Sequence, residues 1–144
     1  MDSEIVKYSG CFVCGDKNPI GLKARFFFDG NQARTEITAD SRFEGYQRIL
    51  HGGIISTLLD EVMIKAVLAR DIYVVTAEMT VKFIRPVKVG DRLHFRGWVT
   101  RQRGRVWLTD GVAEDSQANP YATATGKYIE AGGELRQTLM QSID

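Results

Sequence analysis

The chain has 144 residues, which is enough for one domain with a hydrophobic core. Its 19 Lys and Arg residues against 18 Asp and Glu residues give a net charge of +1, which provides no argument for a nucleic-acid partner or an acidic surface. No apolar segment opens the sequence, so we expect neither a signal peptide nor a membrane anchor. Two cysteines without an export signal favour a reducing, cytoplasmic location. We therefore expect a single domain over residues 1–144.

Residues 1–21 are expected to form an irregular leader. Within it, Cys11-Phe12-Val13-Cys14-Gly15 is similar to a zinc knuckle. A structural zinc takes four ligands, however, and the two histidines of the chain, His51 and His94, do not lie in a second knuckle. A second ligand pair could come only from another copy of the chain. The preferred interpretation is two thiols packed in a tight turn, with no metal.

Two strands are expected next, followed by a polar connection. Residues 22–28 alternate apolar and polar side chains, which predicts a half-buried strand. Asp29-Gly30-Asn31 is typical of a hairpin turn, and residues 32–37 are expected to return as the second strand. Residues 39–50 then lead to an apolar segment of a different period.

Residues 51–70 have the spacing of a buried helix. Apolar side chains recur at positions 55, 58, 59, 62, 66 and 69, and those at 54, 63 and 67 widen the apolar face until little polar surface remains. The segment is too short to cross a membrane, which needs roughly 20 apolar residues. Asp60 shares a face with Ser56 and Thr57, near a glycine-rich start. This acid is the leading candidate for a functional group, although a solvated helix residue is the alternative.

Four further strand patterns follow Asp71, over residues 75–83, 93–99, 106–112 and 121–129. Gly132-Gly133 ends the last of them, and the tail over residues 131–144 is expected to contain a short helix. The order of two strands, one buried helix and four strands predicts an α+β fold. In it, a six-stranded antiparallel sheet curves around one long central helix, which buries every apolar face.

This order, together with His51-Gly52-Gly53 and Asp60 nine positions after the histidine, resembles the hotdog fold. Within that fold it is similar to the phenylacetyl-CoA-thioesterase-like (PaaI-type) acyl-CoA thioesterases. The resemblance covers residues 11–129 and includes Thr76 and the run Phe83-Ile84-Arg85-Pro86-Val87-Lys88-Val89-Gly90-Asp91. It implies a hydrolase that releases a free acid and coenzyme A without a cofactor, acting as a homodimer or homotetramer with sites at the subunit interface.

Thioester hydrolysis needs donors for a developing oxyanion and a group that activates water or attacks directly. Free N–H groups at a helix N-terminus stabilise negative charge. The resemblance implies that the Gly52 N–H is the oxyanion donor, supported by His51, and that Asp60 is the base or nucleophile. It also implies that Thr76 holds the attacking water or orients the carboxylate. From the residues alone, His51 could equally cap the helix, and Thr76 could be an exposed strand residue.

Two other carboxylates compete with Asp60. Glu61 is four residues before Lys65, the favourable orientation for an i,i+4 ion pair, whereas Asp60 has no cation at helical spacing. Glu61 is therefore interpreted as structural. Relatives often carry Asn or Gln upstream of the His-Gly-Gly motif. Here Gln47 is the candidate substitute, and Glu44 is a candidate second carboxylate.

Basic residues at two turns are candidates for the phosphates of coenzyme A, with solvated basic turns as the alternative. They are Arg85 and Lys88 at one strand exit, and Arg101, Arg103 and Arg105 around a hairpin. The acyl pocket is expected to be lined by Tyr46, Ile54 and Leu58. Gly53 is expected to contact the bound substrate.

Two other functions compete with a thioesterase: a non-catalytic acyl-CoA-binding or regulatory module, and a hotdog hydratase or dehydratase. The second would need a catalytic histidine in another context, for which His94 in mid-strand is a poor substitute. An oligomer is predicted because the outer faces of the strands near Glu78, Trp98, Trp107 and Tyr128 are partly apolar.

Overall fold

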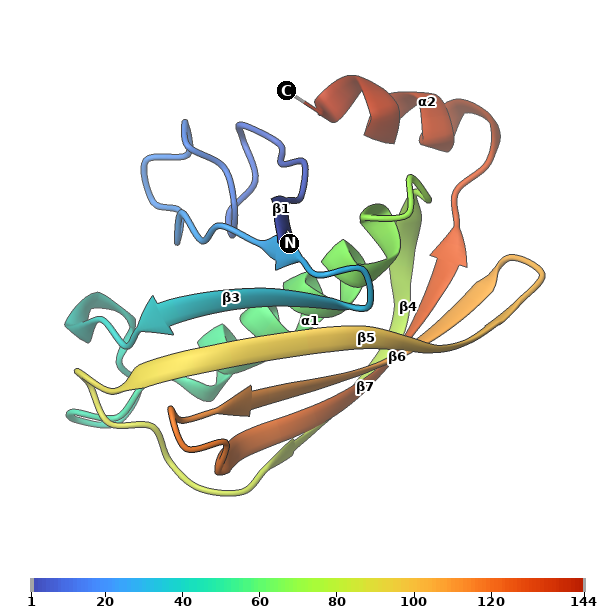
Figure 1. The fold of residues 1–144 in the computed structure, drawn as a ribbon. Helices are drawn as coiled ribbons and strands as arrows, with labels where there is room; N and C mark the ends of the chain where they lie inside the picture. Colours follow the sequence, from blue (N-terminus) through green and yellow to red (C-terminus); the bar gives the residue numbers. More distant parts are fainter. Residues whose placement is uncertain (1, 144) are drawn as a thin grey trace.

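The computed structural model describes residues 2–143 and contains one curved antiparallel sheet wrapped around a long helix (Figure 1). The predicted α+β class and the central helix are confirmed. In chain order the elements are β1 (Ser3–Glu4), β2 (Phe27–Phe28), β3 (Gln32–Thr38), the 3-10 turn η1 (Ser41–Phe43), α1 (Gly52–Leu68), β4 (Val74–Phe83), β5 (Arg92–Arg103), β6 (Val106–Glu114), β7 (Pro120–Glu130) and α2 (Gly133–Ser142).

The sheet has seven strands in the order β1-β2-β3-β5-β6-β7-β4, one more than predicted. The additional strand is β1, in which Ser3 and Glu4 pair with Phe28 and Phe27 of β2. Strand β4 follows the helix in sequence but lies beyond β7, at the opposite edge from β1. One edge of β4 is therefore free of any neighbouring strand among residues 2–143.

The strand expected over residues 22–28 is reduced to its last two residues. Lys23 has a φ of 54°, in the left-handed region, which interrupts an extended chain. The N–H group of Ala24 bonds to the carbonyl of Val13 in the leader at 2.8 Å instead of to a neighbouring strand. This segment is thus tied to the leader, and only its end joins the sheet.

Helix α1 packs into the concave face of the sheet through an apolar surface that includes Leu58, Leu59 and Val62, all fully buried. Burial of each such side chain stabilises the fold by about 1.5–3 kcal/mol. The closest approach is to β5, where a Cβ on Gly97 would lie 2.7 Å from the carbonyl oxygen of Val62. Only glycine allows the helix to sit this close to the strand. Lys65 is also fully buried in this core.

The leader and the C-terminal helix lie on the same side of α1 (Figure 1). Tyr8 of the leader forms an antiparallel bridge with Ile143, just after α2. The N–H group of Ile5 bonds to the carbonyl of Phe26 at 2.8 Å, which fixes the start of the leader against the sheet. Within residues 2–143, no helix has the length and apolar character needed to cross a membrane.

Candidate active site

The start of α1 is built around the His51 side chain. His51 is the N-cap, and its Nδ1 accepts the N–H of Gly53 at 2.8 Å. A Cβ on Gly53 would lie 3.0 Å from the same Nδ1, and a Cβ on Gly45 would lie 3.2 Å from the Cδ2 of His51. The imidazole is therefore held between two glycines. This explains in steric terms why glycine follows the histidine at this spacing.

The N–H of Gly52 has no acceptor in the part of the chain that the structure describes. As the first residue of α1 it has no intrahelical partner, and the capping side chain accepts the next N–H instead. The ring of Phe83, at the end of β4, lies beside it, since a Cβ on Gly52 would be 3.4 Å from the Phe83 Cε1. A free donor at the positive end of a helix can bind a partly negative oxygen.

Asp60 lies two turns further along α1, and two hydroxyl groups from neighbouring strands fix its carboxylate. Thr76 of β4 donates to Oδ1 at 2.9 Å, and Tyr128 of β7 donates to the same oxygen at 2.8 Å. Within the described residues no hydrogen bond reaches Oδ2. The carboxylate is thus oriented through one oxygen and retains a second that can accept a proton or attack an electrophile.

Tyr128 is the residue that the sequence interpretation missed, and its expected place on the outer face of the sheet was wrong. Its side chain is fully buried against α1. A Cβ on Gly126 would lie only 2.5 Å from the Tyr128 ring, so glycine two positions earlier makes room for the ring. Burial and the nearby Asp60 charge raise the pKa of Tyr128 above its ordinary value of 10.0, so the hydroxyl remains a donor.

Glu61 faces away from this site, toward the leader. Its expected pair with Lys65 is present at 3.8 Å, but the pair is buried and not solvated on the helix surface, since the two side chains are only 13% and 1% exposed. Burial, followed by the neighbouring Cys11, raises the pKa of Glu61 to about 7. The two adjacent acids of α1 therefore occupy different environments on different faces of the helix.

The loop before the helix does not bring its candidate residues to Asp60 within the described chain. It folds as a small hairpin in which Glu44 pairs with Leu50. The Glu44 carboxylate accepts the N–H of Arg48 at 2.9 Å, which occupies one of its oxygens within the loop. Tyr46 is 87% exposed and Gln47 is also exposed at the tip.

The basic candidates lie at opposite ends of β7 and do not form one cluster. Phe83, two residues before Arg85, pairs with Ala122 near the start of β7. The hairpin that carries Arg103 and Arg105 leads into Val106, which pairs with Ile129 near the end of β7.

The Arg85 guanidinium donates to Asp115 at 2.7 Å and lies 3.9 Å from the centre of the Tyr121 ring, so it is engaged within the fold. Arg105 donates to the carbonyl of Glu130 at 2.7 Å. Lys88 and Arg103 are exposed. Of the two apolar candidates on α1, Leu58 is fully buried in the core, and Ile54 is partly exposed beside the helix start.

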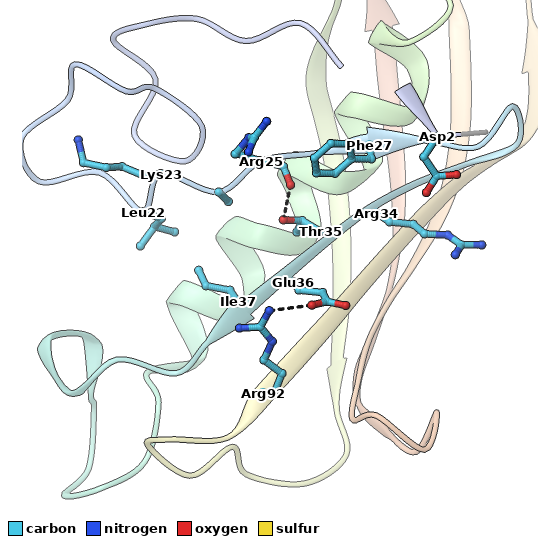
Figure 2. A pocket seen from close by; sticks show the side chains of 11 residues that line it. Asp2, Leu22, Lys23, Arg25, Phe27, Arg34, Thr35, Glu36, Ile37 and Arg92 are labelled. Carbon is cyan, nitrogen blue, oxygen red and sulfur yellow. Dashed lines mark hydrogen bonds and ion pairs between the residues drawn. The ribbon is translucent and has the colours of Figure 1, made fainter. Parts of the chain in front are cut away.

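A cavity of about 520 Å³ lies between the leader, β2 and β3, and Asp60 is not among the residues that line it (Figure 2). Three arginines give it a basic appearance, but each is paired with a carboxylate. The pairs are Arg25 with Glu4, Arg34 with Asp29 and Arg92 with Glu36. Little uncompensated positive charge is left there for a phosphate.

His94 lies on the outer face of the sheet. Its neighbours Leu93 and Phe95 are fully buried against the helix, so the histidine points to the opposite side of β5. Its ring nitrogens lie 3.2 Å from the Glu36 carboxylate and 3.3 Å from the Ser116 hydroxyl. It takes no part in the arrangement around Asp60.

Residues 47–119, half of the chain, match the family described as the thioesterase superfamily. No curated protein matches the chain. A thioesterase superfamily protein of known crystal structure superposes with a TM-score of 0.79 at 20% identity. The match covers 84% of this chain but only 60% of that protein.

Two further structures have the same fold. A hypothetical thioesterase from Streptococcus pneumoniae, crystallised with coenzyme A, superposes with a TM-score of 0.68 at 19% identity, over 71% of this chain and 82% of that one. Two mutant structures of that protein replace an aspartate and a threonine 16 positions later by alanine. The PaaI protein from the phenylacetic acid degradation operon of E. coli has a TM-score of 0.67 at 24% identity, over 71% of this chain and 74% of that one.

Proposed function

The chain belongs to the thioesterase superfamily, and from this premise we propose that it hydrolyses acyl-CoA thioesters to a free acid and coenzyme A. The observation that carries the proposal is the Asp60 carboxylate, held at Oδ1 by Thr76 and Tyr128 with Oδ2 left available. A carboxylate fixed in this way suits a general base or a nucleophile, because its orientation is set before substrate binds.

In the proposed reaction Asp60 takes a proton from a water molecule as the water oxygen bonds to the thioester carbon. The carbonyl oxygen becomes negative and is stabilised by the N–H of Gly52, with His51 supporting the helix start. The C–S bond then breaks, the acid is released, and the coenzyme A sulfur leaves and takes up a proton. In the alternative sequence Asp60 attacks the thioester carbon itself, and water hydrolyses the resulting anhydride.

One subunit cannot supply both groups to the same thioester. Gly52 and Asp60 are eight positions apart on α1, and an α-helix rises 1.5 Å per residue, so they are separated by about 12 Å. An oxyanion donor and a base must both lie within about 3 Å of the reacting atoms. We therefore propose a composite site in which Gly52 of one subunit faces Asp60 of another, in a homodimer or homotetramer.

The free edge of β4 is the proposed contact between those subunits. The edge begins beside Thr76, and Val75 and Phe83 on the same strand are 37% and 53% exposed. An unpaired strand edge with apolar side chains is a favourable surface for pairing with another strand. In that arrangement the partner's loop would bring the exposed candidates Tyr46, Gln47 and Lys88 toward the substrate, with Ile54 and Gly53 beside the acyl group.

The mutated positions in the Streptococcus pneumoniae protein support the choice of residues. An aspartate and a threonine 16 positions apart were replaced there, and 16 positions also separate Asp60 and Thr76. The binding of coenzyme A by that protein supports a coenzyme A thioester as the substrate class. The two free cysteines agree with action in a reducing compartment, which we propose is the cytoplasm.

The proposal is tested by measuring thiol release from a panel of short-chain, long-chain and aromatic acyl-CoAs with the purified protein. Hydrolysis of at least one acyl-CoA that depends on Asp60 is expected. Binding of acyl-CoA without thiol release would instead support a non-catalytic acyl-CoA-binding module. Hydration of a 2-enoyl-CoA without thiol release would support a hydratase. Either result overturns the thioesterase proposal.

A further inference from the structure

A second cluster of reactive groups lies where the leader meets α1, on a face of the helix that Asp60 does not use. The Cys11 sulfur, the Cys14 sulfur and a Glu61 carboxylate oxygen lie within 4.8 Å of one another. Lys65, fully buried on the same helix, donates to Cys14 Sγ at 3.4 Å and to the carbonyl of Val6 at 2.6 Å. The thioesterase reaction proposed above uses none of these groups.

The leader backbone is arranged to stabilise negative charge on one sulfur in particular. The N–H groups of Val13 and Cys14 both donate to Cys11 Sγ, at 3.3 and 3.4 Å. A Cβ on Gly15 would lie 2.3 Å from the carbonyl oxygen of Ser9, so the turn that aims these donors requires glycine. Hydrogen bonds from N–H groups favour the thiolate over the thiol.

The two sulfurs have opposite proton affinities. The neighbouring Cys14 thiol, reinforced by the two backbone donors and the Lys65 charge, lowers the pKa of Cys11 to about 5. The neighbouring Cys11 and burial raise the pKa of Cys14, and together they outweigh the Lys65 charge in contact with it. With two N–H donors and the more exposed position, Cys11 is the nucleophilic sulfur, and Cys14 holds its proton.

Access to the two sulfurs is also unequal. Cys11 and Glu61 line a cavity of about 520 Å³ that opens between Tyr8, Ile64 of α1 and Leu139 of α2. Cys14 is only 2% exposed. A small reagent in this cavity therefore meets Cys11 first.

The position of Lys65 favours thiol chemistry over metal binding. Its ammonium group lies 3.4 Å from Cys14 Sγ and 3.8 Å from the Glu61 carboxylate, where it already supplies positive charge to both. A divalent cation bound by those two residues would lie beside a buried ammonium, and repulsion between such charges is weakly screened in a protein interior. The three-residue cluster also lacks a fourth protein ligand among residues 2–143.

We propose that Cys11 and Cys14 form a peroxide-reactive dithiol, with Cys11 as the attacking sulfur and Cys14 as the resolving sulfur. The Cys11 thiolate attacks one oxygen of a hydroperoxide, the O–O bond breaks, and the leaving oxygen takes one proton from Glu61 or solvent to give an alcohol or water. Cys11 becomes a sulfenic acid. Cys14 Sγ then bonds to Cys11 Sγ, the S–O bond breaks, and the departing hydroxide combines with the Cys14 proton as water. The dithiol loses two electrons and the peroxide gains them.

The test exposes reduced wild-type protein, freed of reductant, to one equivalent of hydrogen peroxide and follows intact mass and peptide maps. We expect the wild type to lose two hydrogens and to form a Cys11–Cys14 disulfide within one chain. Cys14→Ser should instead gain one oxygen at Cys11 that dimedone traps. The matched variant Cys11→Ser should keep Cys14 unmodified over the same time.

A measurement on the wild type alone keeps the test independent of whether the variants fold. With limiting iodoacetamide at pH 6.5, Cys11 should be alkylated faster than Cys14 by more than about tenfold, because its thiolate is favoured and its sulfur is the more accessible of the two. Equal labelling, an unchanged mass after peroxide, a disulfide between chains, or stoichiometric zinc in protein purified without chelator would each overturn the proposal.

Discussion

The hydroxyl of Tyr128 donates to Asp60 Oδ1 at 2.8 Å from a fully buried position on β7. Its cross-strand partner on β4 is Thr76, which donates to the same oxygen at 2.9 Å. The orientation of the carboxylate is therefore set by the register between two strands and not by α1 alone. The pairing of β4 with β7 changes register between Thr76 and Glu78. A different register there would move the Thr76 hydroxyl away from Asp60 and remove one of the two donors.

Substitutions at Asp60 and at Glu61, its neighbour on the helix, distinguish which of the two is the catalytic acid. Asp60→Asn keeps the size of the side chain but removes the base, so kcat should fall about 10²–10⁴-fold. KM should change much less, since acyl-CoA is still bound. Glu61→Gln, on the other face of α1, should stay within a few-fold of the wild-type rate. Thiol release at saturating substrate measures both, after circular dichroism confirms folding.

The reverse result would reassign the catalytic acid. If Glu61→Gln is inactive and Asp60→Asn is active, the acid has been misplaced by one position. If both variants remain active, the carboxylate lies elsewhere in the assembly. Glu44 would then be the next residue to replace.

The two donors to Asp60 are expected to act by positioning it. Tyr128→Phe and Thr76→Val keep the shape of each side chain and remove one hydroxyl. A hydrogen bond to a charged group contributes about 1.5–3 kcal/mol, so each change should lower kcat roughly 10- to 100-fold with little effect on KM. Steady-state kinetics on both variants measure this split, and unchanged kcat in both would contradict the positioning role.

His51 has a capping role and a proposed catalytic role, which two substitutions distinguish. His51→Ala removes the acceptor of the Gly53 N–H and should lower the free energy of unfolding by about 0.5–2 kcal/mol. His51→Asn provides another capping oxygen and should recover most of that stability. If His51 also supports the oxyanion, kcat should stay low in both variants. If His51→Asn recovers both the free energy of unfolding and kcat, His51 acts only as the helix cap.

Local sequence patterns were sufficient to predict the central helix, whereas the resemblance to a thioesterase family selected Thr76, which donates to Asp60 at 2.9 Å in the structure. A buried helix has a strong period, and its start follows from the glycines beside His51. The structure has α1 at Gly52–Leu68, within the predicted residues 51–70.

Features that depend on distant contacts were not predictable in the same way. Tyr128 has the alternation of an ordinary strand residue, and its inward direction depends on the register of β7 against β4. The i,i+4 spacing of Glu61 and Lys65 is that of an ordinary ion pair on a helix and does not indicate that Lys65 is buried. Its burial depends on the leader, whose Val6 carbonyl and Cys14 sulfur accept from Nζ. The sequence provides no local pattern for either contact.

The raised pKa of Glu61 predicts how stability depends on pH. Its folded pKa, about 7, is above the ordinary value of 4.5, so the native state holds this proton more tightly than the unfolded chain does. The contribution to stability is complete below pH 4.5 and is lost as pH rises toward 7. The free energy of unfolding of the wild type, relative to Glu61→Gln, should thus fall by up to about 3 kcal/mol across this range.

Urea denaturation of both proteins at pH 4.5 and pH 7.5 checks this difference. Cys11 titrates in both proteins, and because its charge is one cause of the raised Glu61 pKa, the difference between the proteins includes the interaction of these two groups. A difference that stays constant, or that favours the wild type at the higher pH, would show that Glu61 ionises in the native state at its ordinary value.

The composite site makes a prediction that a single-subunit site cannot reproduce. In a dimer that pairs His51→Ala with Asp60→Asn, one of the two sites carries both substitutions and the other carries neither. Each variant alone should have low activity. Random reassociation gives mixed dimers for half of the molecules, so about a quarter of the wild-type activity should return after the variants are unfolded and refolded together. Light scattering on the same samples should report a dimer or tetramer at micromolar concentration. An active monomer, or no recovery from a mixture that light scattering and mass spectrometry show to contain mixed dimers, would exclude the shared site.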